Sequence, residues 1–279
     1  YHTHNGGDTN ATMTYPPVAT GFGNFPNVVR PKCIAPPIVR QAMAKIYNCF
    51  QDAEVKKKAH ESLMQENAWA WHGVLAALEG ELHCLVINES GLDGALLTEV
   101  FNEIVQEVVR DGGDSPFSAV KLLDLSKNPL RSLKIDGRLF PALEQLNIRL
   151  GQLEEIEIRH CSKLSILDLS QNSLTLFPFL PLLTESPQLK HLTLCSNQLS
   201  DTLTPEIFQA ASNLSALLLQ DNKLCGNIDD NVLQLFPQGA LVDFSRNQLH
   251  LHVDAPVANG LVMNTNGAFI ALQGPAPPP

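Results

Sequence analysis

Two pairs of histidines have the spacing of metal ligands. His2 and His4 lie near the start of the chain, and His250 and His252 lie near its end. Residues two apart on an extended segment point to the same side, so each pair could direct two imidazoles at one ion. Neither pair belongs to a complete metal-binding motif, which combines three or four ligands at set spacings. We therefore expect no metal ion and no other cofactor.

The cysteines are scattered, and none forms a Cys-x-x-Cys pair. They are Cys33, Cys49, Cys84, Cys161, Cys195 and Cys225. Scattered thiols are typical of a reduced, intracellular protein, in the cytoplasm or an organelle interior. Two features leave a secreted protein as the alternative. Cys33 and Cys49 could form a disulfide, and Asn10, Asn88 and Asn213 each begin a glycosylation sequon.

No catalytic motif accompanies these residues. The sequence has no phosphate-binding Gly-x-x-x-x-Gly-Lys loop, no His-Glu-x-x-His helix and no Gly-x-Ser-x-Gly elbow. This favours a protein that is not an enzyme. Because catalytic groups can assemble from distant residues, a site near His191 and Cys195 stays open as an alternative.

The elements that carry these residues follow from a repeat. Eight segments between Leu82 and Ala268 share the pattern Leu-x-x-Leu-x-Leu-x-x-Asn-x-Leu. The second leucine position is occupied by Leu85, Leu123, Leu146, Leu167, Leu192, Leu217, Val242 and Leu261, at intervals of 38, 23, 21, 25, 25, 25 and 19 residues. We expect the first and last copies to be atypical, as terminal repeats are.

Each copy predicts one strand followed by a turn. Leu-x-Leu has the period of a strand, which buries alternate side chains on one face. The asparagine amide carries donors and an acceptor, so it can bind backbone groups of its own turn and of the neighbouring coil. That position holds Asn128, Asn172, Asn197, Asn222, Asn247 and Asn266, with Ser90 and Gly151 in the other two copies.

This pattern resembles the leucine-rich repeat superfamily over about two-thirds of the chain. The resemblance implies an α/β solenoid of about eight coils with a curved parallel sheet, which holds a protein partner and does not catalyse. The segment NKLCGNI from Asn222 is similar to plant-type repeats. The long first coil is similar to the ribonuclease-inhibitor type.

The repeat phase also assigns residues to the outward, concave face of the sheet. One outward row is apolar, and an acidic series lies beside it. Exposed apolar rows mark interaction sites, and the alternative is that the row lies under the N-terminal arm. The candidate partner-binding residues are Leu122, Asp124, Asn147, Arg149, Ile166, Asp168, His191, Thr193, Ala216, Leu218, Gln220, Leu241 and Asp243.

Four regions are predicted along the chain. Residues 1–36 are rich in Gly, Pro, Thr and Asn and predict an extended or disordered arm. Residues 37–81 predict a helical cap, because the open end of a solenoid exposes its core. Residues 82–269 predict the solenoid, and residues 270–279 a proline-rich tail.

Helical spacing of apolar residues predicts three helices in the cap. The first follows Pro37, the second runs from Glu54 to Leu63, and the third from Ala68 to Leu78. A fourth, strongly amphipathic helix runs from Leu96 to Val108 and accounts for the long first interval.

Charge and hydropathy limit the kinds of partner. The formal net charge is -10, with 29 acidic against 19 basic residues, which argues against binding nucleic acid. No apolar stretch reaches the roughly 18 residues that span a bilayer, so we expect no membrane insertion. The sequence favours an intracellular interaction scaffold, which could be a structural subunit of a larger assembly. The alternatives are a secreted or cell-surface recognition receptor and a regulatory subunit of an enzyme complex.

Overall fold

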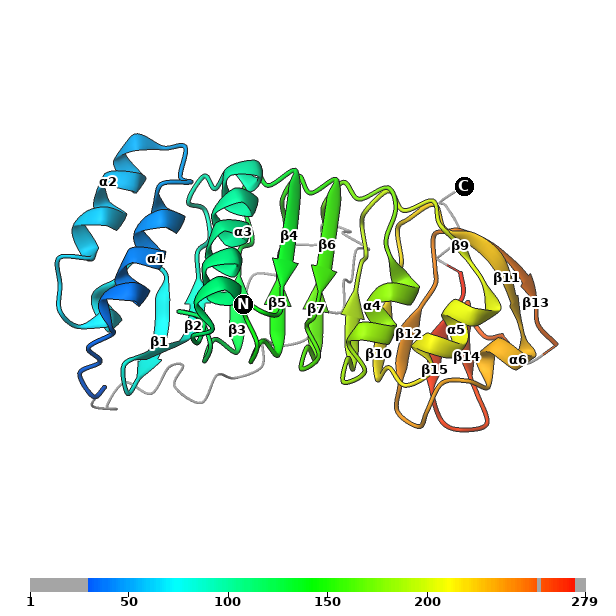
Figure 1. Cartoon of the computed structure of the whole chain (residues 1–279). Coiled ribbons are helices and arrows are strands. Elements are labelled where there is room, and N and C mark those ends of the chain that lie inside the picture. The colour runs from blue at the N-terminus through cyan, green and yellow to red at the C-terminus, as the bar shows by residue number, and fades with distance from the viewer. Residues whose placement is uncertain (1–29, 255–256, 274–279) are drawn as a thin grey trace, which may run out of the picture. The chain divides into compact units, whose positions relative to one another are not determined.

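The computed structural model describes residues 30–254 and 257–273. Within these ranges a ten-stranded sheet has the order β1-β2-β3-β5-β7-β8-β10-β12-β15-β14 (Figure 1). Neighbouring strands from β2 to β15 are parallel, and only the end pairs β1–β2 and β14–β15 are antiparallel. The α/β leucine-rich repeat solenoid predicted from the sequence is therefore confirmed.

The strands of this sheet are short, and most contain three residues. They are β1 (Val74–Leu78), β2 (Glu81–Val86), β3 (Leu122–Asp124), β5 (Gln145–Asn147), β7 (Ile166–Asp168), β8 (His191–Thr193), β10 (Ala216–Leu218), β12 (Leu241–Asp243), β14 (Leu261–Met263) and β15 (Phe269–Ala271). The central residue of each parallel strand from β3 onward points into the core, and these residues stay in register from Leu123 to Ile270.

The return segments of the coils form a second layer across the core (Figure 1). Its helices are α3 (Gly94–Asp111), α4 (Phe179–Glu185), α5 (Pro205–Ala211) and α6 (Asp230–Leu233). Its strands are β4 (Ser132–Asp136) and β6 (Glu155–Arg159), which pair with each other, and β9 (Thr202–Leu203), β11 (Cys225–Asp229) and β13 (Gln248–His252), which form a separate sheet. Pro178 lies just before α4 and Pro205 is the first residue of α5, where proline is tolerated in a helix. No helix in the described ranges is long and apolar enough to cross a bilayer.

A ladder of asparagines ties neighbouring coils together. Asn197 shows the pattern: its Nδ2 donates to the carbonyls of Leu169, Leu194 and Cys195 at 3.0, 3.0 and 3.3 Å. Its Oδ1 accepts from the backbone N–H of Leu174 at 3.1 Å. These partners lie in two successive coils, so one amide satisfies buried backbone groups of both. The other members are Asn128, Asn172, Asn222 and Asn247.

The third coil has Gly151 in place of the ladder asparagine, and the backbone there leaves no room for a side chain. A Cβ added at Gly151 would lie 2.9 Å from the Asn128 carbonyl oxygen and 2.9 Å from Asn172 Oδ1. The Gly151 N–H donates instead to the carbonyl of Gln171 in the next coil. The repeat is thus kept by backbone contact where the amide is missing.

Three of the four predicted helices are present. They are α1 (Pro37–Tyr47), α2 (Ala53–Ser62) and α3, and α3 ends at Gly112 in the left-handed conformation with φ 66°. Glycine adopts this conformation without steric cost and commonly ends helices.

The predicted third helix, Ala68 to Leu78, is wrong. Its first residues form a 3₁₀ turn, η1 (Ala68–Ala70), and Val74–Leu78 forms strand β1. Glu79 and Gly80 have φ of 51° and 81°, which are the angles of a tight hairpin turn. The turn brings β1 back beside β2, where it satisfies the otherwise free backbone groups of the sheet edge.

The eighth repeat is out of phase with its prediction by one residue. Val262, not Leu261, points into the core, and β14 runs antiparallel. The eighth parallel strand is β15, which begins at Phe269 and extends past the predicted solenoid end at residue 269. Asn266 is not a ladder residue of the regular kind, because its Nδ2 donates to the carbonyls of Gln234 and Phe236 in the preceding return segment.

The ladder predicts a large effect of a single amide. Asn197→Ala leaves the buried N–H of Leu174 without a partner and removes one of the two hydrogen bonds to each of the carbonyls of Leu169 and Leu194. We therefore expect a loss of about 1–3 kcal/mol in the free energy of unfolding. Asn213→Ala, at an exposed position, is the matched control and should change it by less than about 0.5 kcal/mol. Urea denaturation followed by circular dichroism measures both. Equal effects of the two substitutions would contradict a stabilising role for the ladder.

Candidate functional site: the open face of the sheet

We call the side of the ten-stranded sheet opposite the core the open face. Strand register aligns two rows of side chains on it. The first row runs through Cys84, Leu122, Gln145, Ile166, His191, Ala216, Leu241 and Phe269, and the second through Val86, Asp124, Asn147, Asp168, Thr193, Leu218, Asp243 and Ala271. Eleven of the thirteen candidate residues lie in these rows, and Arg149 and Gln220 follow their strands by two residues.

The expectation that the apolar row is exposed is wrong for part of its length. Ala216 and Leu218 are only 1% and 0% exposed. Leu122 is buried in a small cluster with Ala76 and Cys84 on this face, separate from the main core. The alternative that the N-terminal arm covers this row concerns residues 1–29, which lie outside the described ranges.

The exposed apolar side chains of the open face gather at its C-terminal end instead. Leu261, Met263 and Phe269 are 55%, 65% and 55% exposed. Phe269 is in register with half-buried Leu241 on one side and with Met263 on the other. We call Leu241, Leu261, Met263 and Phe269 the apolar patch. Sequence reasoning missed three of the four because it placed Leu261 in the core, although alternation about Val262 and Ile270 is the signal that would have found them.

The acidic series is partly internal structure. Asp124, Asp168 and Asp243 each accept a hydrogen bond from the backbone N–H of the serine two residues later, at 2.9 to 3.0 Å. Such contacts stabilise the turn that leaves the strand. Burial raises the pKa of Asp168. The hydrogen bonds from Ser170 and the charge of the Arg149 guanidinium, whose Nε lies 3.7 Å from the carboxylate, lower this pKa but do not outweigh burial.

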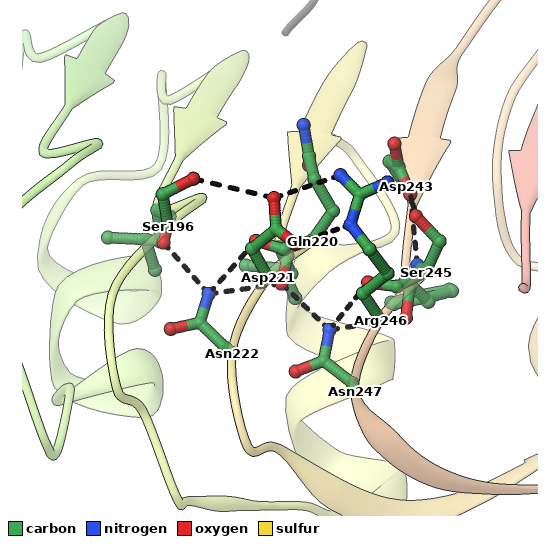
Figure 2. A network of polar contacts seen from close by, with 11 residues as sticks. Ser196, Gln220, Asp221, Asn222, Asp243, Ser245, Arg246 and Asn247 are labelled. Atoms are coloured by element: carbon green, nitrogen blue, oxygen red, sulfur yellow. Dashed lines mark hydrogen bonds and ion pairs between the residues drawn. The ribbon is translucent and has the colours of Figure 1, made fainter. Parts of the chain in front are cut away.

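Polar residues also link the coils at the ends of β10 and β12 (Figure 2). The Arg246 guanidinium forms a two-pronged ion pair with Asp221, in which Nη2 donates to Oδ2 at 2.9 Å. Asp221 and Arg246 both have positive φ, of 58° and 53°. The tight turn that leaves each strand thus places side chains of successive coils beside one another.

One buried amide on this face lacks part of its hydrogen bonding. Within the described ranges, Gln220 Oε1 is buried and accepts no hydrogen bond. Buried acceptors without partners are rare and costly.

The alternative of a catalytic site near His191 and Cys195 is disfavoured by the protonation state of the thiol. His191 lies on β8, and Cys195 lies in the turn that follows this strand. Burial, followed by the nearby Asp168 carboxylate, raises the pKa of the Cys195 thiol to about 11, and burial lowers the pKa of His191. A neutral thiol is a poor nucleophile.

The pair of His250 and His252 gains no third ligand within the described ranges. His250 and His252 are both exposed on β13. In the described ranges no group of three or more His, Cys, Asp or Glu side chains could hold a metal ion. His2 and His4 lie outside those ranges.

All six cysteines are free thiols, and five of them are buried. The Sγ atoms of Cys33 and Cys49 are directed to different backbone carbonyls, those of Glu81 and Lys45. The disulfide considered between these two cysteines is therefore absent from the structure.

The protein is similar to known proteins in structure, but no relative is found from its sequence. No family model matches the sequence, and no curated protein matches it. The leucine-rich repeat ectodomain of the Arabidopsis receptor kinase HAESA, solved with an N-terminally extended IDA peptide hormone, has 20% identity and a TM-score of 0.46 over 76% of this chain and 37% of its own. PEPR1 with AtPEP1 has 18% identity and a TM-score of 0.48, over 76% of this chain and 31% of its own. The Arabidopsis thaliana BIR2 ectodomain has 20% identity and a TM-score of 0.40, over 78% of this chain and 95% of its own. The chain thus spans about a third of HAESA and PEPR1.

Burial of the thiols predicts their order of reaction. Cys225 is the only one that is not fully buried, while burial raises the pKa of Cys84 and Cys161 to about 12. With a disulfide reagent at about pH 8, we expect one fast thiol in the native protein, lost in Cys225→Ser, and six thiols after denaturation without reductant. Fewer than six would show that a disulfide forms in the native source, as the secreted alternative requires.

The raised pKa of Asp168 predicts that replacing its carboxylate by a neutral group stabilises the fold in a pH-dependent way. A carboxyl group whose pKa is higher in the folded than in the unfolded chain weakens folding as the pH rises through the folded value. Asp168→Asn keeps an oxygen for Ser170 and should be more stable than wild type at neutral pH, with the gain vanishing by about pH 3. Urea denaturation at the two pH values tests this, with exposed Asp114→Asn as the control. A pH-independent loss of stability would contradict it.

Proposed function

We propose that this leucine-rich repeat protein is a noncatalytic interaction module that holds a protein partner on the open face of its sheet. The apolar patch carries the proposal. Its four side chains come from three adjacent strands, β12, β15 and β14, on a backbone fixed by sheet hydrogen bonds. Single exposed apolar residues are ordinary, whereas contiguous exposed groups mark interaction sites.

The patch has the chemistry of the centre of an interface. It contains an aromatic ring and a methionine and no charge, and such residues are enriched where charged residues are depleted. Full burial of one side chain of this size contributes about 1.5–3 kcal/mol. Leu261, Met263 and Phe269 could thus supply much of the free energy of one protein contact.

The candidate residues outside the patch that are at least partly exposed form the rest of the proposed surface, whereas Leu122, Thr193, Ala216, Leu218 and Gln220 are buried. Next to the patch, Asp243 continues the second row. Farther along the sheet, Asn147 and Asp124 present half-buried polar groups. A partner that buries an apolar group at the C-terminal end and donates hydrogen bonds along the rows fits this distribution.

We also propose that the protein works in a reducing compartment as a subunit of a larger assembly. Six free and mostly buried thiols support a reducing compartment. The assembly is supported by an apolar patch left uncovered on the single chain.

The patch predicts which substitution removes the partner. Met263→Glu places a charge in the patch, where burial would leave it unpaired, so we expect at least tenfold weaker partner binding. Met64→Glu, at an exposed methionine after α2, is the matched control and should have no effect. The measurement is affinity purification from the native source with quantitative mass spectrometry, after thermal melting shows that both variants fold.

Phe269→Ser repeats the test without adding charge and should remove the same partner. Unchanged recovery of every partner by both patch variants would refute the open face as the binding surface. Recovery lost equally in Met64→Glu would point to a general effect of the added charge.

A further inference from the structure

The layer of helices behind the sheet is interrupted at the second and third coils. The return segments of these coils contain β4 and β6 but no helix. Their intervals, 23 and 21 residues, are the shortest between regular copies. Helix α3 packs beside β4 and α4 lies beside β6, so the two strands lie between two helices (Figure 1).

A groove lies over the outer face of these strands. It consists of two cavities of about 560 and 220 Å³ that share Thr98, Lys134 and Glu157 in their linings. The larger cavity extends to the fourth coil, where Leu176 is 65% exposed and forms an apolar wall with Phe177 and Pro178. The groove is thus bounded by α3 on one side and by an apolar wall on the other.

Acidic groups outnumber basic ones in the groove. Two cations line it, Lys134 and Arg159, and both are ion-paired with Glu157, at 3.6 and 3.8 Å. Five carboxylates line it: Glu99, Asp136, Glu154, Glu155 and Glu157. Within the described ranges, Glu99, Glu154 and Glu155 form no ion pair. The unpaired charge in the groove is therefore negative, with Glu99 on α3 and with Glu154 and Glu155 at the start of β6.

We propose that this groove binds a basic amphipathic helix of a partner protein. The five residues of β4 extend over about 16 Å, which a helix of about 11 residues matches. The partner helix fills the gap in the helix layer, with an apolar residue against Leu176. Its lysines or arginines lie near Glu99, Glu154 and Glu155.

This site is separate from the open face and does not depend on the function proposed for it. The hydrophobic core and the ten-stranded sheet lie between the two surfaces. The protein would thus hold two partners at once, or one partner at two places.

A synthetic peptide tests the proposal on the full chain. The probe is a 14-residue helical peptide with leucines on one face and lysines on the other, and its binding is followed by fluorescence anisotropy. We expect Glu154→Gln with Glu155→Gln to weaken binding about fivefold, and Leu176→Ser to weaken it similarly. Amide hydrogen exchange should show protection by the peptide in residues 154–157 and 175–178.

Matched variants separate this site from general attraction to an acidic chain. Glu61→Gln with Glu206→Gln changes the net charge equally at exposed positions elsewhere, and Val109→Ser removes an apolar side chain elsewhere. Both controls and Met263→Glu should bind the peptide like wild type. Equal weakening by the control pair, equal binding of a glutamate version of the peptide, or no binding would overturn the proposal. Self-association of the chain that is lost in the Glu154, Glu155 variant would assign the groove to a second copy instead.

Discussion

The asparagine ladder is the constraint on which the rest of the structure depends. Each coil leaves its strand through a tight turn whose carbonyls and N–H groups are buried, and a buried backbone group without a partner costs about as much as a lost hydrogen bond. One amide at a fixed place in the repeat pairs groups in two coils, as Asn222 does with the carbonyls of Leu194 and Leu219. Adjacent strands are therefore held in register, and every residue of the repeat has a fixed direction.

With the strands fixed, the length of the return segment decides what forms behind the core. An interval of 38 residues accommodates the five-turn helix α3, whereas intervals of 23 and 21 leave room only for β4 and β6. Intervals of 25 add a short helix such as α5. Variation in repeat length thus leaves the sheet regular and makes the opposite layer irregular, which is how a groove arises between α3 and α4.

The ends of a parallel sheet have no next coil, and this chain resolves both in the same way. At each end a hairpin adds one antiparallel strand, β1 beside β2 and β14 beside β15. An added strand pairs the backbone N–H and C=O groups of the sheet edge. Its own side chains then alternate between the core and the open face. At the first end Ala76 faces outward in a small cluster with Leu122. At the other end Leu261 and Met263 stay exposed, so the apolar patch is a consequence of how the sheet terminates.

The sequence by itself determined the repeat, the parallel sheet, the ladder asparagines and the rows of the open face between β3 and β12. All of these are set by local periodicity, because every coil has the same alternation of side chains along its strand and the same spacing of the asparagine. Only the tertiary structure decided the fate of Val74–Leu78, the phase of the last coil and the burial of Leu218. These depend on contacts between distant segments: β1 is a strand because β2 has a free edge, and Val262 points inward because Ile270 opposite it does. A groove between α3 and α4 has the same origin, since no single repeat contains both of its walls.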